Sequence, residues 1–212
     1  MQLAFDTSSP TVTVAVHDGA DVVAERVSDR TMRHGEQLMP LVEEVLRTAG
    51  LSPRDLTAIS VGVGPGPFTG LRVGLVTART LAHALTLPVY GVCSLDVLAV
   101  EAVDTGAVTG PFVVATDARR REVYLATYDE TGTRVSGPDV GRPVDLATSA
   151  PVVGEGAALY AEHFPDGRAP LRPSAGWLAQ TVVDERAELH DPEPLYLRRP
   201  DAEVPRAPKP VS

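Results

Sequence analysis

Apolar and polar residues alternate along the chain with a period that changes several times between strand-like and helix-like. Val12, Val14 and Val16 recur at every second position, which is typical of a half-buried strand. From residue 34 apolar positions recur every three or four residues, which indicates an amphipathic helix that ends at Gly50 and accepts Pro40 in its first turn. The patterns predict strands over 2–6, 11–16, 22–27, 56–63 and 88–92 and helices over 34–49, 70–85 and 94–103.

The chain is organised around residues 61–85, which contain the end of a strand, a loop rich in glycine and proline, and a helix. Thr69 is the candidate N-cap residue of this helix. The helix is apolar around nearly its whole circumference, so it lies either at the centre of its domain or beneath a partner. The loop has no lysine where a P-loop requires one. Its glycines suit either an anion at the helix start or two closely packed backbones.

The second half of the chain repeats the pattern of the first. Residues 3–19 align without gaps with residues 114–130, which sets Asp6 against Asp117 at the end of a strand in each half. Residues 152–156 repeat the strand and glycine loop described above. Such a duplication predicts two similar halves. The predicted parts are an N-terminal domain over 1–105, a smaller C-terminal domain over 106–200 and a disordered, proline-rich tail over 201–212.

Composition limits the classes of partner and location. The 212-residue chain has a formal net charge of −9, which disfavours tight binding of nucleic acid by the chain alone, because phosphate contacts need a basic surface. Cys93 is the only cysteine, which excludes an internal disulfide and a cysteine-based zinc cluster. No apolar run approaches the roughly 20 residues of a membrane-spanning helix. The N-terminal residues also lack the order of a signal peptide. We therefore expect a cytoplasmic protein that does not engage membranes.

The two aspartates in equivalent turns, together with the glycine loop, are the candidates for cofactor binding. In folds that clamp phosphates between paired hairpins, such turns face the cleft between the halves. The simpler interpretation is that Asp6 and Asp117 each accept hydrogen bonds from their own turn. The residues that a cleft of this kind would offer to a cofactor are Asp6, Thr7, Gly64 and Gly66.

The sequence contains no pattern of a metal centre or of a catalytic nucleophile. A helical metal site that includes His34 needs a second ligand four residues later, where Leu38 stands. Cys93 has no recognisable histidine partner, and the chain has no G-x-S-x-G motif. The three arginines at 119–121 form the one basic cluster, which suits a solvated turn or a weak contact with a phosphate backbone. The residues therefore predict no catalytic site and no metal site.

Six segments together resemble the bacterial TsaB (YeaZ) family, in the order found in that family and over nearly the whole chain up to Arg199. They are LAFDTSSPTVTVAV, HGEQLMPLVEEVL, VGVGPGPFTGLRVGLVTARTLA, GVCSLDVLA, DARRREVYLATYD and PLYLRRP. The most specific is GPGPFTGLRVG, in which Pro67 stands where the family usually has serine. Proline offers neither the N–H nor the hydroxyl group of serine, which weakens an anion-binding role of the loop.

The resemblance implies an α/β protein with an actin-like ASKHA (ribonuclease H-like) fold, built from two duplicated subdomains that each contain a mixed β-sheet and helices. It also implies a role in forming threonylcarbamoyladenosine beside the anticodon of tRNA. In that family TsaB looks like a non-catalytic dimerisation subunit of TsaD, which binds the metal and transfers the threonylcarbamoyl group. TsaE, an ATPase, joins the pair, and tRNA is bound only through the complex. The chain is expected to have no cofactor of its own, and ATP or ADP at the interface with its partner is left open.

The resemblance further implies that the first two helices pair with two helices of TsaD as a four-helix bundle. When TsaD is absent, the same surface suits a homodimer. Catalytic TsaD carries an H-x-x-x-H motif on the helix that here has His34 and Leu38. The expected interface residues are Leu38, Leu41, Val42, Val45, Thr69, Gly70, Val73, Gly74, Thr77 and Ala78. The alternatives are a small-molecule kinase of the same superfamily, which the paired aspartate turns favour, and a peptidase, for which the sequence shows no nucleophile–base pair.

Overall fold

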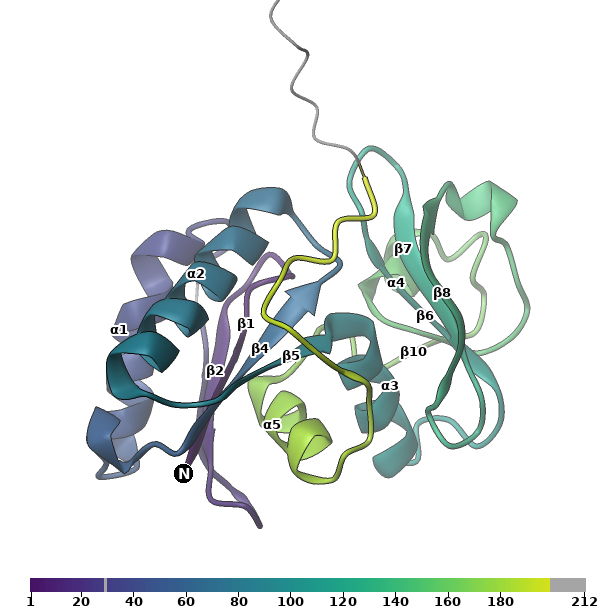
Figure 1. The fold of residues 1–212 in the computed structure, drawn as a ribbon. Coiled ribbons are helices and arrows are strands. Elements are labelled where there is room, and N and C mark those ends of the chain that lie inside the picture. The colour runs from purple at the N-terminus through teal and green to yellow at the C-terminus, as the bar shows by residue number, and fades with distance from the viewer. Residues whose placement is uncertain (29, 199–212) are drawn as a thin grey trace, which may run out of the picture.

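The computed structural model describes residues 1–28 and 30–198 and arranges them around two β-sheets (Figure 1). The first sheet has the strand order β11-β5-β4-β1-β2-β3, and the second has the order β10-β9-β6-β7-β8. The first sheet contains β1 (Gln2–Asp6), β2 (Thr13–His17), β3 (Val22–Val27), β4 (Ala58–Gly64), β5 (Val89–Cys93) and β11 (Leu189–His190). The second contains β6 (Phe112–Asp117), β7 (Val123–Tyr128), β8 (Arg134–Gly141), β9 (Val152–Val153) and β10 (Gly167–Arg168).

Helices cover both faces of the first sheet. Figure 1 shows α1 and α2 side by side on one face, whereas α5 lies on the other face and α3 lies between the two sheets. The α-helices are α1 (His34–Thr48), α2 (Phe68–Leu85), α3 (Ser94–Asp104), α4 (Glu155–Leu159) and α5 (Ala175–Val183), and the short 3₁₀ helices are Pro53–Asp55 and Pro143–Asp145. The elements expected from the sequence are therefore present, with ends that differ by a few residues.

The two sheets share one pattern of strand order and direction. β1 is antiparallel to β2 and parallel to β4, and β6 is antiparallel to β7 and parallel to β9. Asp6 and Asp117 both end the first strand of their sheet. This repeated order is the one expected of two ribonuclease H-like halves, so the predicted actin-like fold class is confirmed.

The core of the first sheet lies beneath α1 and α2. Leu38 and Val45 on α1 and Leu71 and Leu75 on α2 are at most 3% exposed and pack with the strand residues. Burial of each such side chain stabilises the fold by about 1.5–3 kcal/mol relative to exposure. A separate core joins α3 to the second sheet, so α3 fixes the position of one half against the other.

The end of the described chain returns to the first sheet. α5 packs against β1 and β2, and β11 pairs antiparallel with β5. Leu195 then donates its N–H to the carbonyl of Val63 at 2.9 Å. Part of the predicted C-terminal domain, 106–200, thus covers the first sheet, while the division at residue 105 stays a prediction. The predicted disordered tail, 201–212, lies outside the described residues.

Two local predictions about the helices are wrong. α2 begins at Phe68 with Pro67 at the N-cap, so Thr69 lies inside the first turn. Pro40 lies in the second turn of α1, where its exposed position leaves the unpaired carbonyl of Glu36 to water. Ser94 is the first residue of α3, as the predicted start of that helix requires, and its hydroxyl donates to the Asp6 carboxylate. Among the described residues, we find no helix with the length and apolar character to cross a membrane.

Candidate functional site

The Asp6 carboxylate, at the end of β1, accepts hydrogen bonds from two segments of the first half. Oδ1 accepts from the N–H and the hydroxyl of Ser8, both at 2.6 Å. Oδ2 accepts from the Ser94 hydroxyl at 2.6 Å. Burial raises the pKa of Asp6, which is 1% exposed, and the hydrogen bonds from Ser8 and Ser94 oppose that rise. Asp6 therefore closes its own turn and ties it to the start of α3.

The cleft between the two halves is nearly filled. Ser8, Ser94 and Asp117 from the strand ends meet Glu155 and Arg172, and the remaining cavity measures about 10 Å³. Such a volume holds about one water molecule, whereas small-molecule pockets measure roughly 300–1,000 Å³. The geometry does not favour the kinase alternative, since this conformation offers a nucleotide no room in the cleft.

The glycines of the loop allow close packing within the chain, against the Ser8 backbone at Gly66 and against side chains at Gly62 and Gly64. A Cβ atom on Gly62 would lie 1.8 Å from Asp6 Oδ2, and one on Gly66 would lie 2.4 Å from the Ser8 carbonyl oxygen. Gly64 has a φ angle of +97° and packs against Leu71. Gly64 and Gly66, predicted as cofactor contacts, are buried against the chain itself.

The start of α2 packs just as closely against the turn that follows β1. The Thr7 hydroxyl donates to the Gly70 carbonyl at 2.9 Å, and a Cβ atom on Gly74 would lie 2.3 Å from that hydroxyl oxygen. His34 Nε2 lies 2.8 Å from the Ser9 carbonyl oxygen, and the side chain is buried. Thr7 and His34 thus hold the fold together, and no group of three metal-ligating side chains occurs among the described residues.

Most of the predicted interface residues lie inside the chain, so their prediction as surface residues is corrected. Leu38, Val42, Val45, Gly70, Gly74 and Ala78 are buried against the first sheet or the turn after β1. Leu41, Val73 and Thr77 are half-buried, and Thr69 is exposed. Gly70 and Gly74 of α2 therefore allow a close contact with Thr7 of the same chain.

An uncharged surface nevertheless runs along the outer side of α1 and α2. Gly35 lies against Val73, where a Cβ atom would be 3.9 Å from Val73 Cγ2, so these two helix faces adjoin. Val76 is 62% exposed and Met39 is 39% exposed. We define the helix-pair surface as Gly35, Met39, Thr69, Val73, Val76 and Thr80, which fall at helical spacing on the two elements.

The chain itself covers the other flank of α2. The rings of Phe68 and Tyr196 stack with centroids 5.0 Å apart, and Arg72 donates to the Tyr196 hydroxyl at 3.0 Å. Arg79 pairs with Glu193 at 2.7 Å. The sheet, α1 and the C-terminal segment therefore each cover part of α2.

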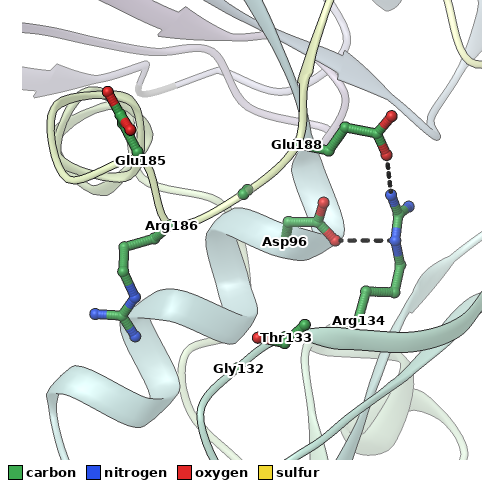
Figure 2. A pocket seen from close by; sticks show the side chains of 8 residues that line it. Asp96, Gly132, Thr133, Arg134, Glu185, Arg186 and Glu188 are labelled. Carbon is green, nitrogen blue, oxygen red and sulfur yellow. Dashed lines mark ion pairs between the residues drawn. The ribbon is translucent and has the colours of Figure 1, made fainter.

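A polar cavity of about 320 Å³ lies where α3 meets the turn before β8 and the segment before β11. Figure 2 shows Arg134 between Asp96 and Glu188, with 3.6 Å from Arg134 nitrogen atoms to an oxygen of each carboxylate. The Tyr128 hydroxyl donates to Asp96 at 2.7 Å. Burial raises the pKa of Asp96, and the hydrogen bond from Tyr128 opposes this rise. This cluster links α3 with both sheets.

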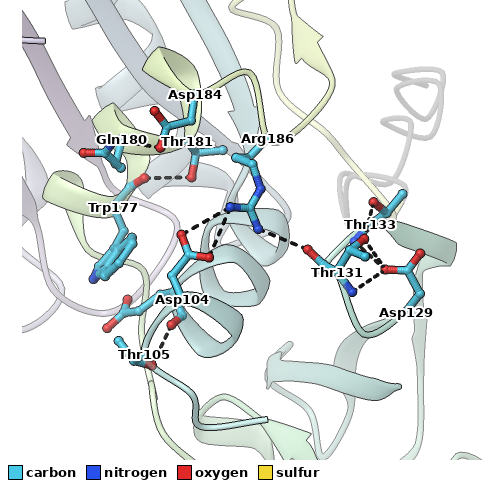
Figure 3. Close-up of polar contacts among 11 residues, drawn as sticks. Asp104, Thr105, Asp129, Thr131, Thr133, Trp177, Gln180, Thr181, Asp184 and Arg186 are labelled. Atoms are coloured by element: carbon cyan, nitrogen blue, oxygen red, sulfur yellow. Dashed lines mark hydrogen bonds and ion pairs between the residues drawn. The ribbon is translucent and has the colours of Figure 1, made fainter. Parts of the chain in front are cut away.

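Arg186 provides a second link between the halves (Figure 3). Its Nη1 donates to Asp104 Oδ1 at the end of α3 at 3.1 Å, and its Nη2 donates to the Thr131 carbonyl at 3.1 Å. Asp129 organises the same turn by accepting from the N–H of Thr131 at 2.9 Å. The two halves are thus also joined by polar contacts whose residues do not line the filled cleft.

Glu101, on α3, is expected to make stability depend on pH. Its Oε2 is buried without a hydrogen-bond partner among the described residues, and burial, with a contribution from Glu25, raises its pKa from 4.5 to about 7. Because the folded-state pKa lies above the unfolded value, the stabilising contribution is complete below pH 4.5 and is lost as the pH rises through about 7. We expect Glu101→Gln to raise the free energy of unfolding at about pH 8 by about 1 kcal/mol, because the site is half-exposed. This corresponds to a rise in Tm of roughly 3 °C.

Thermal unfolding at pH 4.5 and pH 8 measures this effect. Glu130→Gln, at an exposed turn position, is the matched control and should change Tm equally at both pH values. An increase in Tm for Glu101→Gln that is the same at pH 4.5 and pH 8 would contradict the raised pKa of Glu101.

The chain matches a family model described as TsaD, tRNA N6-adenosine threonylcarbamoyltransferase, over residues 22–163. It is 44% identical over 208 residues to an uncharacterized protein of Mycobacterium tuberculosis, covering 94% of this chain and 92% of that protein. It is 36% identical over 126 residues to the Bacillus subtilis tRNA threonylcarbamoyladenosine biosynthesis protein TsaB. That match covers 59% of this chain and about half, 54%, of the curated relative.

A solved structure with the same arrangement is YeaZ from Pseudomonas aeruginosa. It matches with a TM-score of 0.74 and 29% sequence identity, covering 92% of this chain and 99% of that chain. The likeness extends over both sheets, because nearly all of each chain is included.

Proposed function

The chain belongs to the TsaB (YeaZ) family, and from this membership we propose that it acts in tRNA threonylcarbamoyladenosine biosynthesis as the non-catalytic partner of TsaD. Relatives that carry the TsaB name are described as biosynthesis proteins for this modified nucleoside. The proposal assigns threonylcarbamoyl transfer to TsaD and a supporting role to this chain.

The filled cleft supports a non-catalytic role. The cavity beside the Asp6 and Asp117 turns, of about 10 Å³, leaves no space for a substrate at that cleft. His34 is buried against Ser9, and the position one helical turn later is Leu38, which is also buried. The resemblance implies that catalytic TsaD has two histidines at these positions. His34 and Leu38 are therefore packed inside this chain, as expected of a subunit with a structural role.

The helix-pair surface is the observation that carries the pairing with TsaD. It is uncharged across two adjoining helices, and Val76 near its centre is 62% exposed. Charged residues such as Glu43 and Arg72 flank it. An uncharged centre with a charged rim is the usual composition of a protein–protein interface. A pair of helices from a second subunit would bury this surface as a four-helix bundle.

Purified chain and TsaD from the same organism provide the test. We expect the two proteins to elute together in gel filtration, and expect transfer of the threonylcarbamoyl group to unmodified tRNA to require both. The chain without TsaD should transfer nothing. Separate elution, together with full transferase activity of TsaD in the absence of the chain, would overturn the proposed function.

The proposal extends to the further components implied by the family. TsaE and a nucleotide, ATP or ADP, would associate with the pair and not with this chain alone, whose cleft is filled. Calorimetric titration of ATP into the chain, into TsaD and into their mixture distinguishes these cases. Binding of ATP to the isolated chain would favour the kinase alternative instead.

A further inference from the structure

Three consecutive arginines form the turn between β6 and β7 in a left-handed backbone conformation. The φ angles of Arg119, Arg120 and Arg121 are +62°, +56° and +61°. This region costs free energy for residues with a Cβ atom, and glycine or asparagine adopts it more readily. All three residues are exposed. We call residues 119–121 the arginine turn. Glycine or asparagine would adopt this backbone conformation at a lower cost in free energy than arginine does.

Hydrogen bonds hold the arginine turn at its base. Ala118 donates its N–H to the Glu122 carbonyl at 3.0 Å, and Glu122 donates its own to the Arg119 carbonyl at 3.0 Å. The N–H of Arg119 donates to Asp117 Oδ1 at 2.8 Å. Arg198 donates to the Ala118 carbonyl at 2.7 Å and forms an ion pair with Glu122. A ligand therefore meets a backbone that is already ordered, which lowers the entropic cost of binding.

The equivalent turn in the first half has a different environment. The alignment sets Thr7, Ser8, Ser9 and Pro10 against Ala118 and the three arginines. Thr7, Ser8 and Ser9 are at most 8% exposed, and Pro10 is half-buried. They pack beneath α1 and α2 through the contacts of Thr7 and His34 described above. The duplicated fold therefore does not require arginine in this turn, and an exposed position at the strand end is particular to the second half.

The arginine turn lies beside the start of α1. Arg119 Nη2 is 3.2 Å from Met32 Sδ, and Met32 is two residues before α1 begins at His34. Arg33, which is also exposed, lies there too and pairs with Glu36 at 3.3 Å. Acidic groups among the described residues near the turn include Asp117, 3.5 Å from Arg119, and Glu122, which pairs with Arg198. The positive surface thus adjoins the end of the helix-pair surface.

We propose that the arginine turn contacts the sugar–phosphate backbone of tRNA when this chain is paired with TsaD. The inference rests on the proposed function, which supplies both the partner and the RNA. Guanidinium groups remain charged and form paired hydrogen bonds with phosphate oxygen atoms. The chain has a net charge of −9, so it repels RNA as a whole, and the partner must bring the RNA close. Contacts of this kind position RNA without reading its sequence.

A salt series of tRNA affinities tests the arginine turn. The probe is an unmodified tRNA transcript, and its binding to the complex of this chain with TsaD is measured by fluorescence anisotropy. The variant is Arg120→Asn with Arg121→Asn, which removes two charges and keeps residues that tolerate the left-handed region. For each phosphate that the variant no longer neutralises, we expect the slope of log affinity against log salt to fall by about one. The affinity should fall by about tenfold per phosphate at about 0.1 M salt.

A matched double variant controls for the change in net charge. Arg47→Asn with Arg54→Asn also removes two exposed charges, at the end of α1 and in the 3₁₀ helix before β4. Its salt slope should equal that of the wild type. The Tm of the Arg120→Asn, Arg121→Asn variant should be equal to or higher than that of the wild type, which excludes unfolding as the cause of weaker binding.

The outcomes separate this inference from the proposed function. If the arginine-turn variant forms the complex and binds tRNA with the wild-type salt slope, the inference is overturned and the pairing with TsaD stands. If the wild-type chain forms no complex with TsaD, the proposed function fails, and the inference fails with it. A reduced slope in the arginine-turn variant, with an unchanged slope in the control, supports the contact.

Discussion

Alanine in place of Gly62 is expected to destabilise the protein by roughly 3–5 kcal/mol, which lowers Tm by about 10 °C for a chain of this size. The added Cβ atom would lie 1.8 Å from Asp6 Oδ2 and 2.9 Å from Ser94 Oγ. Both side chains are buried, and the Ser94 hydroxyl donates a hydrogen bond to Asp6 Oδ2 at 2.6 Å. Either the carboxylate leaves its hydrogen bonds, which strands buried polar groups, or β1 and β4 separate.

Gly110→Ala is the matched control for this experiment. Nothing lies within 4 Å of a Cβ atom at Gly110, so alanine there should leave Tm unchanged or raise it slightly by restricting the unfolded chain. The double variant Asp6→Ala with Gly62→Ala should be less destabilised than the sum of the single variants, because the first change removes the atoms that the second would meet. A Tm for Gly62→Ala within about 2 °C of the wild type would contradict the close packing at this position.

The strand and helix pattern was predictable from the sequence because it depends on local periodicity. The alternation at Val12, Val14 and Val16 predicts a strand without reference to residues distant in the sequence. Most elements from β1 to α3 have a similar local pattern of apolar and polar residues. The repeat that aligns Asp6 with Asp117 predicted two similar halves, and the two sheets share one pattern of strand order and direction.

The surroundings of α2 were not predictable, because they depend on residues distant in the chain. Gly70 and Gly74 pack against Thr7, more than sixty residues earlier, and Phe68 stacks on Tyr196 near the end of the described residues. The sequence of an apolar helix does not indicate which part of the protein covers each of its faces. The sequence therefore indicated a buried helix, and it contained nothing to show that the chain itself covers Gly70, Gly74 and Ala78.

The candidate site shows the same limit. The sequence offered two roles for the Asp6 turn and two for the glycine loop, and it contained nothing about the volume between the halves. That volume depends on how Ser8, Ser94, Asp117 and Arg172 meet across the cleft. The left-handed backbone at Arg120 was equally hidden, since arginine carries no signal for a positive φ angle.

Aspartate at Val76 is expected to weaken pairing with TsaD by at least about a hundredfold. Val76 is 62% exposed in the chain itself, so the substitution should change its Tm by little, as most exposed substitutions do. Within a helix-to-helix interface the carboxylate would be buried without a partner, which costs about 3–5 kcal/mol, and about 2.8 kcal/mol corresponds to a hundredfold change in Kd. Val45→Asp does not serve this purpose, because Val45 is fully buried and aspartate there would unfold the chain.

Val135→Asp provides the control for Val76→Asp, since it makes the same change at a position on β8 that is 69% exposed. Titration of each chain into TsaD by calorimetry, with Tm measured in parallel, separates loss of pairing from loss of folding. Wild-type affinity for Val135→Asp and at least about hundredfold weaker affinity for Val76→Asp would support the helix-pair surface as the interface. Because the two substitutions add the same charge at similar exposure, equal affinities would mean that TsaD binds a different surface of the chain.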